Sequence, residues 1–486
     1  MSGKHVPEST SLTRLDKGVV RAENSGAPSQ SSWQPCVLET TQMKGLHILI
    51  VGHACFPNMG SEAGVTWNWA WHLAERNRVW VIAHGFARPL VEQHMRDHPR
   101  PNLHFIWVGP LGWWDPWRDP TPTKARGLRL HYLLWQHAAV AVAQRLVAME
   151  AIDIVHHVSW NSISAPPLLW RTGKPFVWGP IGGGQVLPWR FLTSIGRTAV
   201  LELLRNLRVG IMPWTPSLRR TVARTDLLLA ANSETAGALK RAGAGHVRLL
   251  PDIGVPAELL QPPSPERAAS PKLIVLWAGR LVRWKGLAIF LKVAKAVRTQ
   301  DVRFLVAGWG RHQWMERYIQ RLGLNDRVVF LGRLSWQEMQ QRFAEADLFM
   351  FTSLRDTFGA VNFEALAKGC PVMCLNHQGV GSHLPDAVAI KVPATTTQAV
   401  VRAMASHIDS LASDRARLRR MSQAGYSFAT TQQWKDRALL MEQLYRRVLA
   451  RRSAKLTSMA AWKGICAKDE KDVDRRGGGF QPVDRY

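Results

Sequence analysis

Cysteine is scarce in this 486-residue sequence. The five cysteines are scattered, odd in number and without the spacing of metal ligands: Cys36, Cys55, Cys370, Cys374 and Cys466. This pattern argues against a disulfide-stabilised scaffold or a cysteine-bound metal, and it fits a protein of a reducing compartment. We expect Cys370 and Cys374, which flank a strand-like run, to be small core residues.

Long apolar runs are also missing. No stretch reaches the roughly 18 uninterrupted apolar residues of a membrane-spanning helix. The N-terminal region lacks the apolar core of a secretory signal, and residues 1–44, rich in Ser, Pro, Thr and Gln, are expected to form a disordered extension. Residues 453–486 are expected to form a flexible tail. These features favour a cytoplasmic protein whose contact with a membrane would be peripheral.

Acidic residues are few beside basic ones, with 36 Asp and Glu against 63 Lys and Arg and a formal net charge of +27. In residues 187–225 a single acid, Glu202, accompanies seven arginines interleaved with bulky apolar residues: Arg190, Arg197, Arg205, Arg208, Arg219, Arg220 and Arg224. With the Trp-rich segment 112–120, this pattern suits an anionic membrane, such as the inner face of the plasma membrane, or an acidic acceptor. A solvated helix face is the structural alternative. No nucleic-acid-binding motif accompanies the charge, so we expect no nucleic-acid partner.

Strand-like apolar runs alternate with helix-like segments in the first half of the chain. The expected strands are 46–52, 78–84, 102–109, 152–159, 175–180 and 226–232, the expected helices are 63–76 and 128–150, and 247–256 closes this half. Buried apolar runs separated by helices predict a parallel sheet with helices on both faces.

A linker rich in Pro and Ser, residues 256–271, precedes a second series of the same kind. Strands are expected at 272–279, 302–308, 327–332, 347–353 and 371–376, and helices at 287–298, 312–322, 336–345, 360–368 and 432–452. The sequence therefore predicts an α/β protein with two tandem Rossmann-like, doubly wound domains, 45–255 and 272–425, followed by C-terminal helices over 426–452.

Two loops that follow the first strand of each predicted domain have the composition of anion sites, because ligands of such sheets bind beyond the carboxyl ends of the strands. In "NMGSEAG" (58–64), Gly60 would let the backbone approach a phosphate at a helix N-terminus; a tight turn is the alternative. In "AGRLVRWKG" (278–286), Arg280 and Lys285 could neutralise a diphosphate without a metal; a solvated basic loop is the alternative.

A third stretch, 353–372, places two carboxylates, Asp356 and Glu364, on either side of Phe358-Gly359. Glu364 lies on a short helix with apolar residues almost all round it, where its carboxylate could accept two hydroxyl hydrogen bonds from a ribose. Asp356 could reach other sugar hydroxyls, and the N–H groups after Phe358-Gly359 could bind phosphate oxygens. The structural alternatives are a capping role for Asp356 and a buried salt bridge for Glu364. No GxGxxG fingerprint with a following acid appears, so a dinucleotide site is disfavoured.

Together these loops resemble the retaining nucleotide-sugar glycosyltransferases of the GT-B fold, family 4 (glycosyl transferases group 1). The strongest mark is an acid-x7-acid element followed by a G-x-P-V strand, which "DTFGAVNFEALAKGCPV" (356–372) matches with Asp356 where the family usually has Glu. The resemblance extends to "GPIGGGQ" (179–185) and "ANSETAGALKRAG" (231–243), and covers 44–452. It implies an acceptor-side domain facing a donor-side domain across a cleft, with the last helices crossing back to the first domain.

The resemblance also implies roles for individual residues. The donor would be bound by Gly60, Arg280, Lys285, Phe358, Gly359 and Glu364. Asp356 would contact the donor sugar near the reacting centre. The family commonly has a catalytic histidine in a strand written D-x-x-H-x-H; in "IDIVHHVSW" His156 matches the first histidine and Val158 stands at the second. His156 or the adjacent His157 is therefore the candidate, with a structural histidine as the alternative.

The implied activity is transfer of a hexose from a UDP- or GDP-sugar, with retention, to a glycan or lipid-linked acceptor in cell-surface polysaccharide or glycolipid biosynthesis. We expect no cofactor and no metal. One alternative is a nucleotide-sugar 2-epimerase, which would need acids in the cleft of the first domain, where few are visible. The other is a non-catalytic basic protein that binds polyanions.

Overall fold

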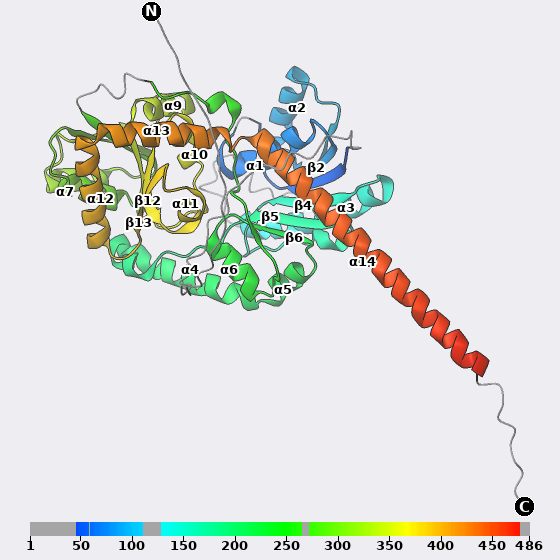
Figure 1. Ribbon diagram of the computed structural model, residues 1–486. Helices are drawn as coiled ribbons and strands as arrows, with labels where there is room; N and C mark the ends of the chain where they lie inside the picture. The colour runs from blue at the N-terminus through cyan, green and yellow to red at the C-terminus, as the bar shows by residue number, and fades with distance from the viewer. Residues whose placement is uncertain (1–44, 58, 110–127, 265–271, 477–486) are drawn as a thin grey trace, which may run out of the picture. The chain divides into compact units, whose positions relative to one another are not determined.

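The computed structural model describes residues 45–57, 59–109, 128–264 and 272–476. These residues form two parallel sheets with helices around each of them (Figure 1). The predicted extension 1–44, the Trp-rich segment 112–120, linker residues 265–271 and the last residues, 477–486, lie outside the described part of the chain. Among the described residues, no helix is long and apolar enough to cross a membrane.

The N-terminal domain is built on a seven-stranded sheet in the order β3-β2-β1-β4-β5-β6-β7, with every neighbouring pair parallel. Its strands are β1 (His47–Gly52), β2 (Arg78–His84), β3 (Leu103–Val108), β4 (Ile154–Ser159), β5 (Phe176–Ile181), β6 (Leu227–Ala230) and β7 (Arg248–Leu249). Alternate residues of β1 enter two different apolar clusters, one on each face of the sheet. The sheet is therefore buried on both sides, as its nearly continuous apolar runs predict.

The described part of this domain contains six α-helices: α1 (Ser61–Leu73), α2 (Arg88–Asp97), α3 (Leu128–Met149), α4 (Ala199–Ile211), α5 (Pro216–Ala223) and α6 (Ser233–Arg241). Helices α1 and α3 were expected within a few residues of these bounds. Asn232 is the N-cap residue of α6, and its side chain accepts a hydrogen bond from the Thr235 N–H.

The C-terminal domain has a six-stranded parallel sheet in the order β10-β9-β8-β11-β12-β13. Its strands are β8 (Leu273–Arg280), β9 (Val302–Trp309), β10 (Val328–Gly332), β11 (Leu348–Phe351), β12 (Val372–Asn376) and β13 (Ala389–Pro393). The helices are α7 (Leu287–Ala296), α8 (Gln313–Leu322), α9 (Trp336–Glu345), α10 (Val361–Ala367), α11 (Gln378–His383), α12 (Thr397–Ser413) and α13 (Arg415–Thr430). In both sheets the strand order reverses beside the first strand, β1 or β8. This is the doubly wound arrangement predicted from the sequence.

The last helix, α14 (Trp434–Arg476), returns to the N-terminal domain, as the resemblance implied. Trp434 contacts Trp69 of α1 edge-on, with ring centroids 5.4 Å apart, and Tyr445 lies against His156 of β4. The helix is longer than expected, because residues 453–476 are helical and not part of a flexible tail. This segment contains no proline and has four alanines and four lysines, which favour helix even where apolar periodicity is weak.

One segment of the N-terminal domain packs into the core of the other domain. Leu187, Phe191 and Ile195 are buried in the same apolar cluster as Trp277 of β8 and Phe290 of α7. The predicted boundary at 255 therefore separates the strands of the two sheets, but it does not separate the two apolar cores. Among the described cysteines, Cys55, Cys370 and Cys374 are buried, and the expectation that Cys370 and Cys374 are small core residues is confirmed.

Candidate functional site

The first strand of each sheet ends at the point where the strand order reverses. Strand β8 ends at Arg280, and its neighbour β11 leads into the loop that carries Asp356. In the other sheet, β1 leads into the loop that carries Gly60. Parallel sheets bind ligands in the crevice beyond these strand ends.

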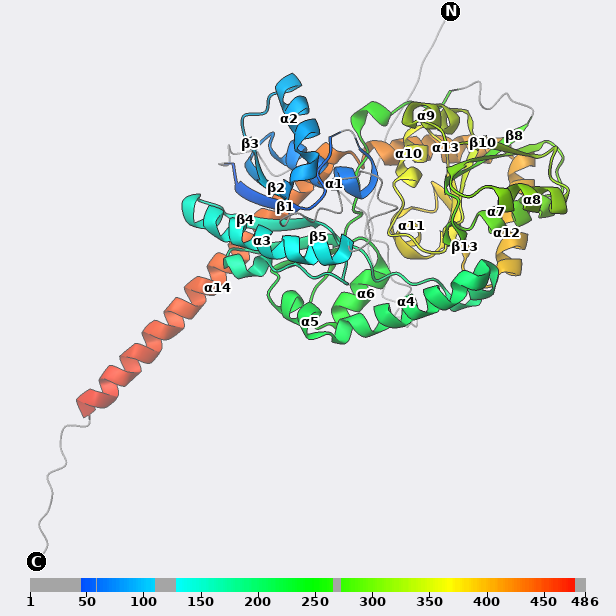
Figure 2. The same ribbon diagram turned by 180° about the vertical axis from the view of Figure 1, so that it is seen from behind.

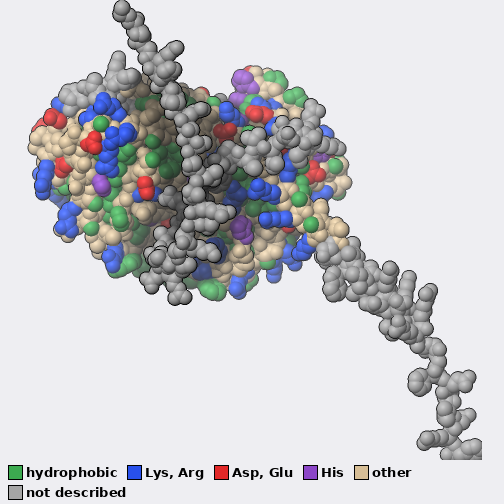
Figure 3. Space-filling model, viewed as in Figure 1, with side chains coloured by type: hydrophobic (Ala, Val, Ile, Leu, Met, Phe, Trp, Pro, Cys, Tyr) green, Lys and Arg blue, Asp and Glu red, His purple; other side chains and the backbone are tan. Residues whose placement is uncertain are grey.

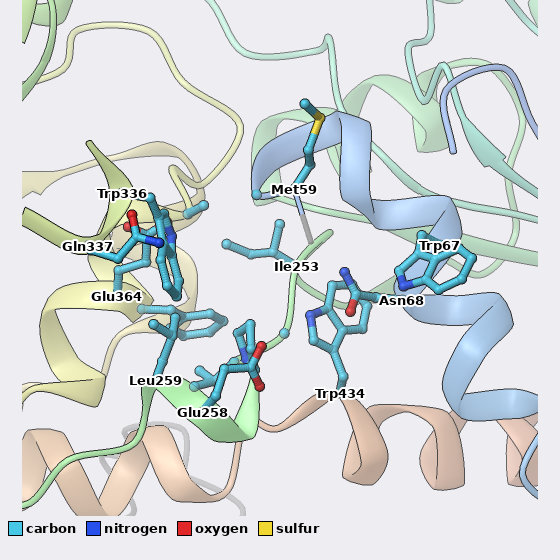
Figure 4. Close-up of a pocket in the computed structure, with 16 residues that line it drawn as sticks. Met59, Trp67, Asn68, Ile253, Glu258, Leu259, Trp336, Gln337, Glu364 and Trp434 are labelled. Atoms are coloured by element: carbon cyan, nitrogen blue, oxygen red, sulfur yellow. The ribbon is translucent and has the colours of Figure 1, made fainter. Parts of the chain in front are cut away.

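A pocket of about 330 Å³ lies between the Gly60 loop and helices α9, α10 and α14. Trp336, Gln337 and Glu364 project from one wall, while Met59 and Asn68 lie on the other (Figure 4). The remaining lining residues are Gly60, Trp67, Ile253, Gly254, Val255, Pro256, Glu258, Leu259, Ala360, Phe363 and Trp434. A volume of this size suits part of a small-molecule ligand.

Gly60 and Glu364, predicted as donor-binding residues from opposite domains, face each other in this pocket. A β-carbon placed on Gly60 would lie 3.8 Å from Oε1 of Glu364. Any longer side chain at position 60 would therefore take up space beside the carboxylate. The structure brings these two predicted residues together.

The Glu364 carboxylate is held by a neutral partner. Nε2 of Gln340 on α9 donates a hydrogen bond to Oε2 of Glu364 at 3.2 Å. Removal of water around the carboxyl raises the pKa of Glu364 above its ordinary value, and the Gln340 hydrogen bond opposes part of that shift. Among the described residues, none forms a salt bridge with Glu364, so the predicted alternative of a buried salt bridge is wrong.

The ion pair in this region belongs to Asp356 and Lys285. Nζ of Lys285 contacts Oδ2 of Asp356, with both side chains about one-fifth exposed. The Thr357 N–H also donates to Oδ1 of Asp356 at 3.2 Å. The residue that precedes α10 is Ala360 and no side chain caps this helix, so the predicted capping role for Asp356 is not what the described residues form. In this state the two residues neutralise each other, and a bound diphosphate would compete with Asp356 for Lys285.

Gln378 holds the Asp356 loop in place. No sequence motif marks this residue. Its Oε1 accepts a hydrogen bond from the Asp356 N–H at 2.6 Å, and its Nε2 donates to the Leu354 carbonyl at 2.8 Å. Its own N–H donates to Glu234 of the N-terminal domain at 2.8 Å. Gln378 has a φ of 57°, which is uncommon for a residue other than glycine and is typical of positions held by their surroundings at functional sites.

The two further sequence elements of the resemblance meet the same loop. Nε2 of Gln185, from "GPIGGGQ", donates to Oγ1 of Thr357 at 3.1 Å, and Nδ2 of Asn232, from "ANSETAGALKRAG", donates to its carbonyl oxygen at 3.1 Å. Both motifs of the N-terminal domain therefore hydrogen-bond to the residue next to Asp356.

Phe358 and Gly359 shape the entry to α10 and leave fewer N–H donors than expected. Phe358 is buried, and Gly359 has a φ of 86° with a β-carbon position 2.8 Å from the Phe351 ring, so only glycine fits. Helix α10 is a short seven-residue helix, and the Asn362 N–H donates to the Gly359 carbonyl at 3.1 Å. The expected phosphate cap at this helix is thus weaker than predicted, because that N–H is engaged within the turn.

Arg280 and Lys285 lie near the strand end but do not line the pocket that holds Gly60 and Glu364. Arg280 is exposed at the end of β8, and Lys285 follows in the short 3₁₀ turn Arg283–Lys285. Gly286 then turns the chain with a φ of 75°, where a β-carbon would lie 2.0 Å from the Thr352 carbonyl oxygen. The structure joins Lys285 to Asp356, and it gives no described contact between Arg280 and either carboxylate.

The two candidate catalytic histidines are buried in the sheet. Nε2 of His156 donates to the Gly179 carbonyl at 2.7 Å, which leaves Nδ1 to accept a hydrogen bond from the Tyr445 hydroxyl at 2.6 Å. Burial lowers the pKa of His156 to about 4 and that of His157 to about 3. Nε2 of His157 contacts the Tyr132 hydroxyl at 3.1 Å. This packing matches the structural alternative and gives no support to a catalytic histidine here.

Replacing Tyr445 with phenylalanine is expected to lower the free energy of unfolding by about 1–3 kcal/mol, because Nδ1 of His156 would remain buried without its donor. Urea unfolding of the full chain measures the change. Tyr426→Phe on α13 is the control, and we expect little change from it. Equal stability of Tyr445→Phe and the wild-type protein would mean that this hydrogen bond contributes nothing.

Two acids near the pocket were missed by the sequence analysis. Desolvation, together with the charge of Asp252, raises the pKa of Glu62 to about 7, although Glu62 is an exposed residue at the start of α1. The pKa of Asp252 is raised to about 6, mainly by burial and also by Asp356, while Arg437 opposes the shift. No local motif identifies Asp252, because the tertiary fold brings it near Glu62 and Asp356.

The solved structures that the chain resembles are GT-B glycosyltransferases. Sucrose-phosphate synthase from Thermosynechococcus elongatus aligns with a TM-score of 0.57 at 19% identity, over 84% of this chain and 100% of that one. Anabaena HepE in complex with UDP aligns with a TM-score of 0.53 at 18% identity, over 85% of this chain and 100% of that one. At these identities the likeness establishes the fold, two Rossmann-like domains of the GT-B type.

The sequence comparisons identify one domain. Residues 263–428 match the family model described as Glycosyl transferases group 1, so the C-terminal half carries that domain. D-inositol 3-phosphate glycosyltransferase from Nocardia farcinica is 28% identical over 240 residues, which cover 44% of this chain and 52% of that protein. The chain spans between 26% and 52% of the length of the curated relatives that it matches.

Proposed function

We propose that this protein is a glycosyltransferase that moves a hexose from a UDP- or GDP-sugar to a glycan or lipid-linked acceptor, with retention and without a metal. The observation that carries the proposal is the approach of Gly60 to Glu364 across one pocket. The Lys285–Asp356 pair does not line this pocket and lies at the switch point of the second sheet. The glycosyl transferases group 1 domain at 263–428 contains both carboxylates and both proposed diphosphate-binding cations.

The nucleoside of the donor would occupy the pocket. Trp336 is 47% exposed there and presents an aromatic face on which a base could stack. Glu364 lies in the same pocket, where its carboxylate would accept hydrogen bonds from two ribose hydroxyls. Gly60 would leave room for the chain of phosphates beside this carboxylate.

Lys285 and Arg280 would stabilise the nucleoside diphosphate as it leaves the sugar. When the glycosidic bond breaks, negative charge grows on the diphosphate, and fixed donors aimed at it lower the barrier. Lys285 would exchange Asp356 for a phosphate oxygen, and the freed Asp356 would turn to the donor sugar. Arg280, exposed at the neighbouring strand end, would supply the second positive charge by a movement of its side chain. Closure of the two domains would exclude water, which would otherwise hydrolyse the donor.

A nucleotide-sugar 2-epimerase is the second candidate, and one observation favours it. That reaction needs groups in the cleft of the N-terminal domain that can take and return a proton. Glu62 and Asp252, whose pKa values of about 7 and about 6 lie near neutrality, are acids of this kind. In a transferase the same two residues would bind acceptor hydroxyl groups.

Product analysis separates the two candidates. The full chain would be incubated with UDP- and GDP-sugars, with and without a membrane-lipid extract, and the products resolved by mass spectrometry and NMR. We expect a nucleoside diphosphate together with a glycosylated acceptor. Formation of a free 2-epimeric sugar, or of its nucleotide derivative without any transfer, would favour the epimerase. Absence of nucleotide binding with salt-dependent polyanion binding would reject both.

We also propose that α4 contacts an anionic membrane. Six of its apolar side chains are each more than half exposed, and most of them recur at the spacing of one helix face: Val200, Leu201, Leu203, Leu204, Leu207 and Ile211. Exposed arginines lie before, on and after this helix: Arg190, Arg208, Arg219, Arg220 and Arg224. Helix α4 lies at the edge of the molecule (Figure 2), and basic side chains are spread over the face shown in Figure 3 with few acidic ones between them.

The double variant Leu204→Ser/Leu207→Ser is expected to lower binding to vesicles containing anionic lipid about tenfold or more. The membrane would bury both leucines, and full burial of one leucine side chain contributes roughly 1.5–3 kcal/mol. Sedimentation with vesicles measures the change. The control Leu90→Ser/Leu439→Ser removes exposed leucines of α2 and α14, and its binding should equal that of the wild-type protein. Binding that does not change with the anionic lipid content of the vesicles would contradict the membrane proposal.

A further inference from the structure

Three histidines from distant parts of the sequence meet in the N-terminal domain, apart from the donor pocket. His53 directly follows β1, His84 is the last residue of β2, and His131 lies near the start of α3. All three side chains are fully buried. Since β1 and β2 are neighbouring parallel strands, their carboxyl ends place His53 and His84 at the same edge of the sheet, and α3 supplies the third ring.

The nitrogen atoms of this cluster lie close enough together for one metal ion to reach all three after small side-chain rotations. One ring nitrogen from each histidine lies within 4.8 Å of the others. The ring centroids of His53 and His84 are 5.0 Å apart, and those of His84 and His131 are 5.2 Å apart. Tetrahedral zinc with Zn–N bonds of about 2.0–2.1 Å needs nitrogen atoms roughly 3.4 Å apart. Small rotations of the side chains would bring the three nitrogen atoms to this separation.

The surroundings of the cluster are aromatic. The His53 ring contacts Phe86, Tyr132, Trp135 and Trp160 at centroid distances of 4.9–5.9 Å. A site of three imidazoles in an apolar shell suits Zn²⁺ and similar divalent transition-metal ions, whereas Mg²⁺ and Ca²⁺ need oxygen ligands.

We propose that His53, His84 and His131 form a binding site for one divalent transition-metal ion, with Zn²⁺ as the best match. The ion would fasten α3 to the carboxyl ends of β1 and β2. Nδ1 of His84 accepts a hydrogen bond from the Phe86 N–H at 3.2 Å. A neutral imidazole has a single lone pair on nitrogen, so His84 would exchange this hydrogen bond for its bond to the metal. The fourth position would be left to water.

The site would be structural and separate from the transfer chemistry. Donor departure would depend on Lys285 and Arg280 at the second sheet, whereas the histidines lie at the first sheet. Chelation should therefore reduce stability more than it reduces affinity for a nucleoside diphosphate. This separation also lets the metal site fail experimentally while the proposed function stands.

Metal content and thermal stability test the proposal. The full chain, treated with a chelator and then given Zn²⁺, is expected to bind one equivalent and to unfold at a higher temperature. His84→Ala and His131→Ala should each lower zinc affinity at least tenfold and abolish the rise in unfolding temperature. The control His94→Ala/His98→Ala removes two neighbouring histidines of α2 and its C-terminal end, and it should behave like the wild-type protein.

X-ray absorption of the zinc-bound wild-type protein identifies the ligands even if the histidine variants fail to fold. We expect a shell of nitrogen and oxygen atoms at about 2.0 Å with the scattering pattern of imidazole. A sulfur shell at about 2.3 Å would overturn the proposal, because it would assign the metal to cysteine. Loss of zinc in His94→Ala/His98→Ala, or no stoichiometric binding by the wild-type protein, would overturn it equally.

Discussion

Replacing Lys285 with alanine is expected to lower kcat/KM for sugar transfer by about 10²–10³, the effect typical of removing one donor that stabilises developing negative charge. Two effects act together in this variant. The diphosphate loses a cation as it leaves, and the Asp356 carboxylate, which pairs with Lys285 in the structure, becomes an unpaired negative charge beside an anionic donor. Lys285→Arg keeps the charge and should retain more activity than Lys285→Ala.

Lys295→Ala is the matched control for this experiment, since Lys295 is an exposed lysine of the helix that follows the same loop. Its kcat/KM should equal that of the wild-type protein. Thermal unfolding of both variants shows whether the fold persists. Wild-type activity in a folded Lys285→Ala protein would remove Lys285 from the site and, with it, the argument that cations replace a metal.

Replacing Glu364 with alanine is expected to weaken binding of UDP or GDP by about a hundredfold or more. A carboxylate that accepts two ribose hydroxyls makes two charge-assisted hydrogen bonds, each worth roughly 1.5–3 kcal/mol. Isothermal titration with both nucleotides measures the loss and shows which base is preferred. Glu316→Gln, an exposed acid of α8, is the control. Unchanged affinity of Glu364→Ala would place the ribose elsewhere.

The same residue predicts a dependence on pH. Desolvation raises the pKa of Glu364, so its carboxylate takes up a proton at a higher pH than an ordinary glutamate. The protonated group loses acceptor capacity for ribose hydroxyls. Nucleotide affinity should therefore be highest above the raised pKa and fall as the pH is lowered through it. Glu364→Gln should bind weakly at every pH and lack this dependence.

The sheets were predictable from the sequence because parallel strands are buried on both faces and therefore appear as short apolar runs. Strands β1, β2 and β9 match their predicted bounds to within one residue. Helices α2, α4, α5, α6, α11, α12 and α13 and strand β13 were not assigned from the sequence. Helix α4 was not recognised because its leucines are exposed, so its apolar face is not the face that packs on a sheet.

The site was predictable where one local segment carries the chemistry, and not where the chain folds back. The stretch 353–372 holds Asp356 and Glu364 within one loop and helix, so their spacing is visible in the sequence. Gln378, Gln340 and Asp252 act through interactions with residues remote from them in the sequence, and no motif surrounds them. His156 shows the opposite error, since a sequence pattern suggested chemistry where Tyr445 and Gly179 engage both ring nitrogens.

Insertion of Leu187, Phe191 and Ile195 into the core beside Trp277 has a consequence for protein engineering. A chimaera that joins two such chains at 256–271 would keep each sheet intact, yet it would pair the second core with three foreign side chains. Exchange of the acceptor half should therefore succeed only when the crossover also matches residues 187–195, or when those three positions are grafted together with the new half.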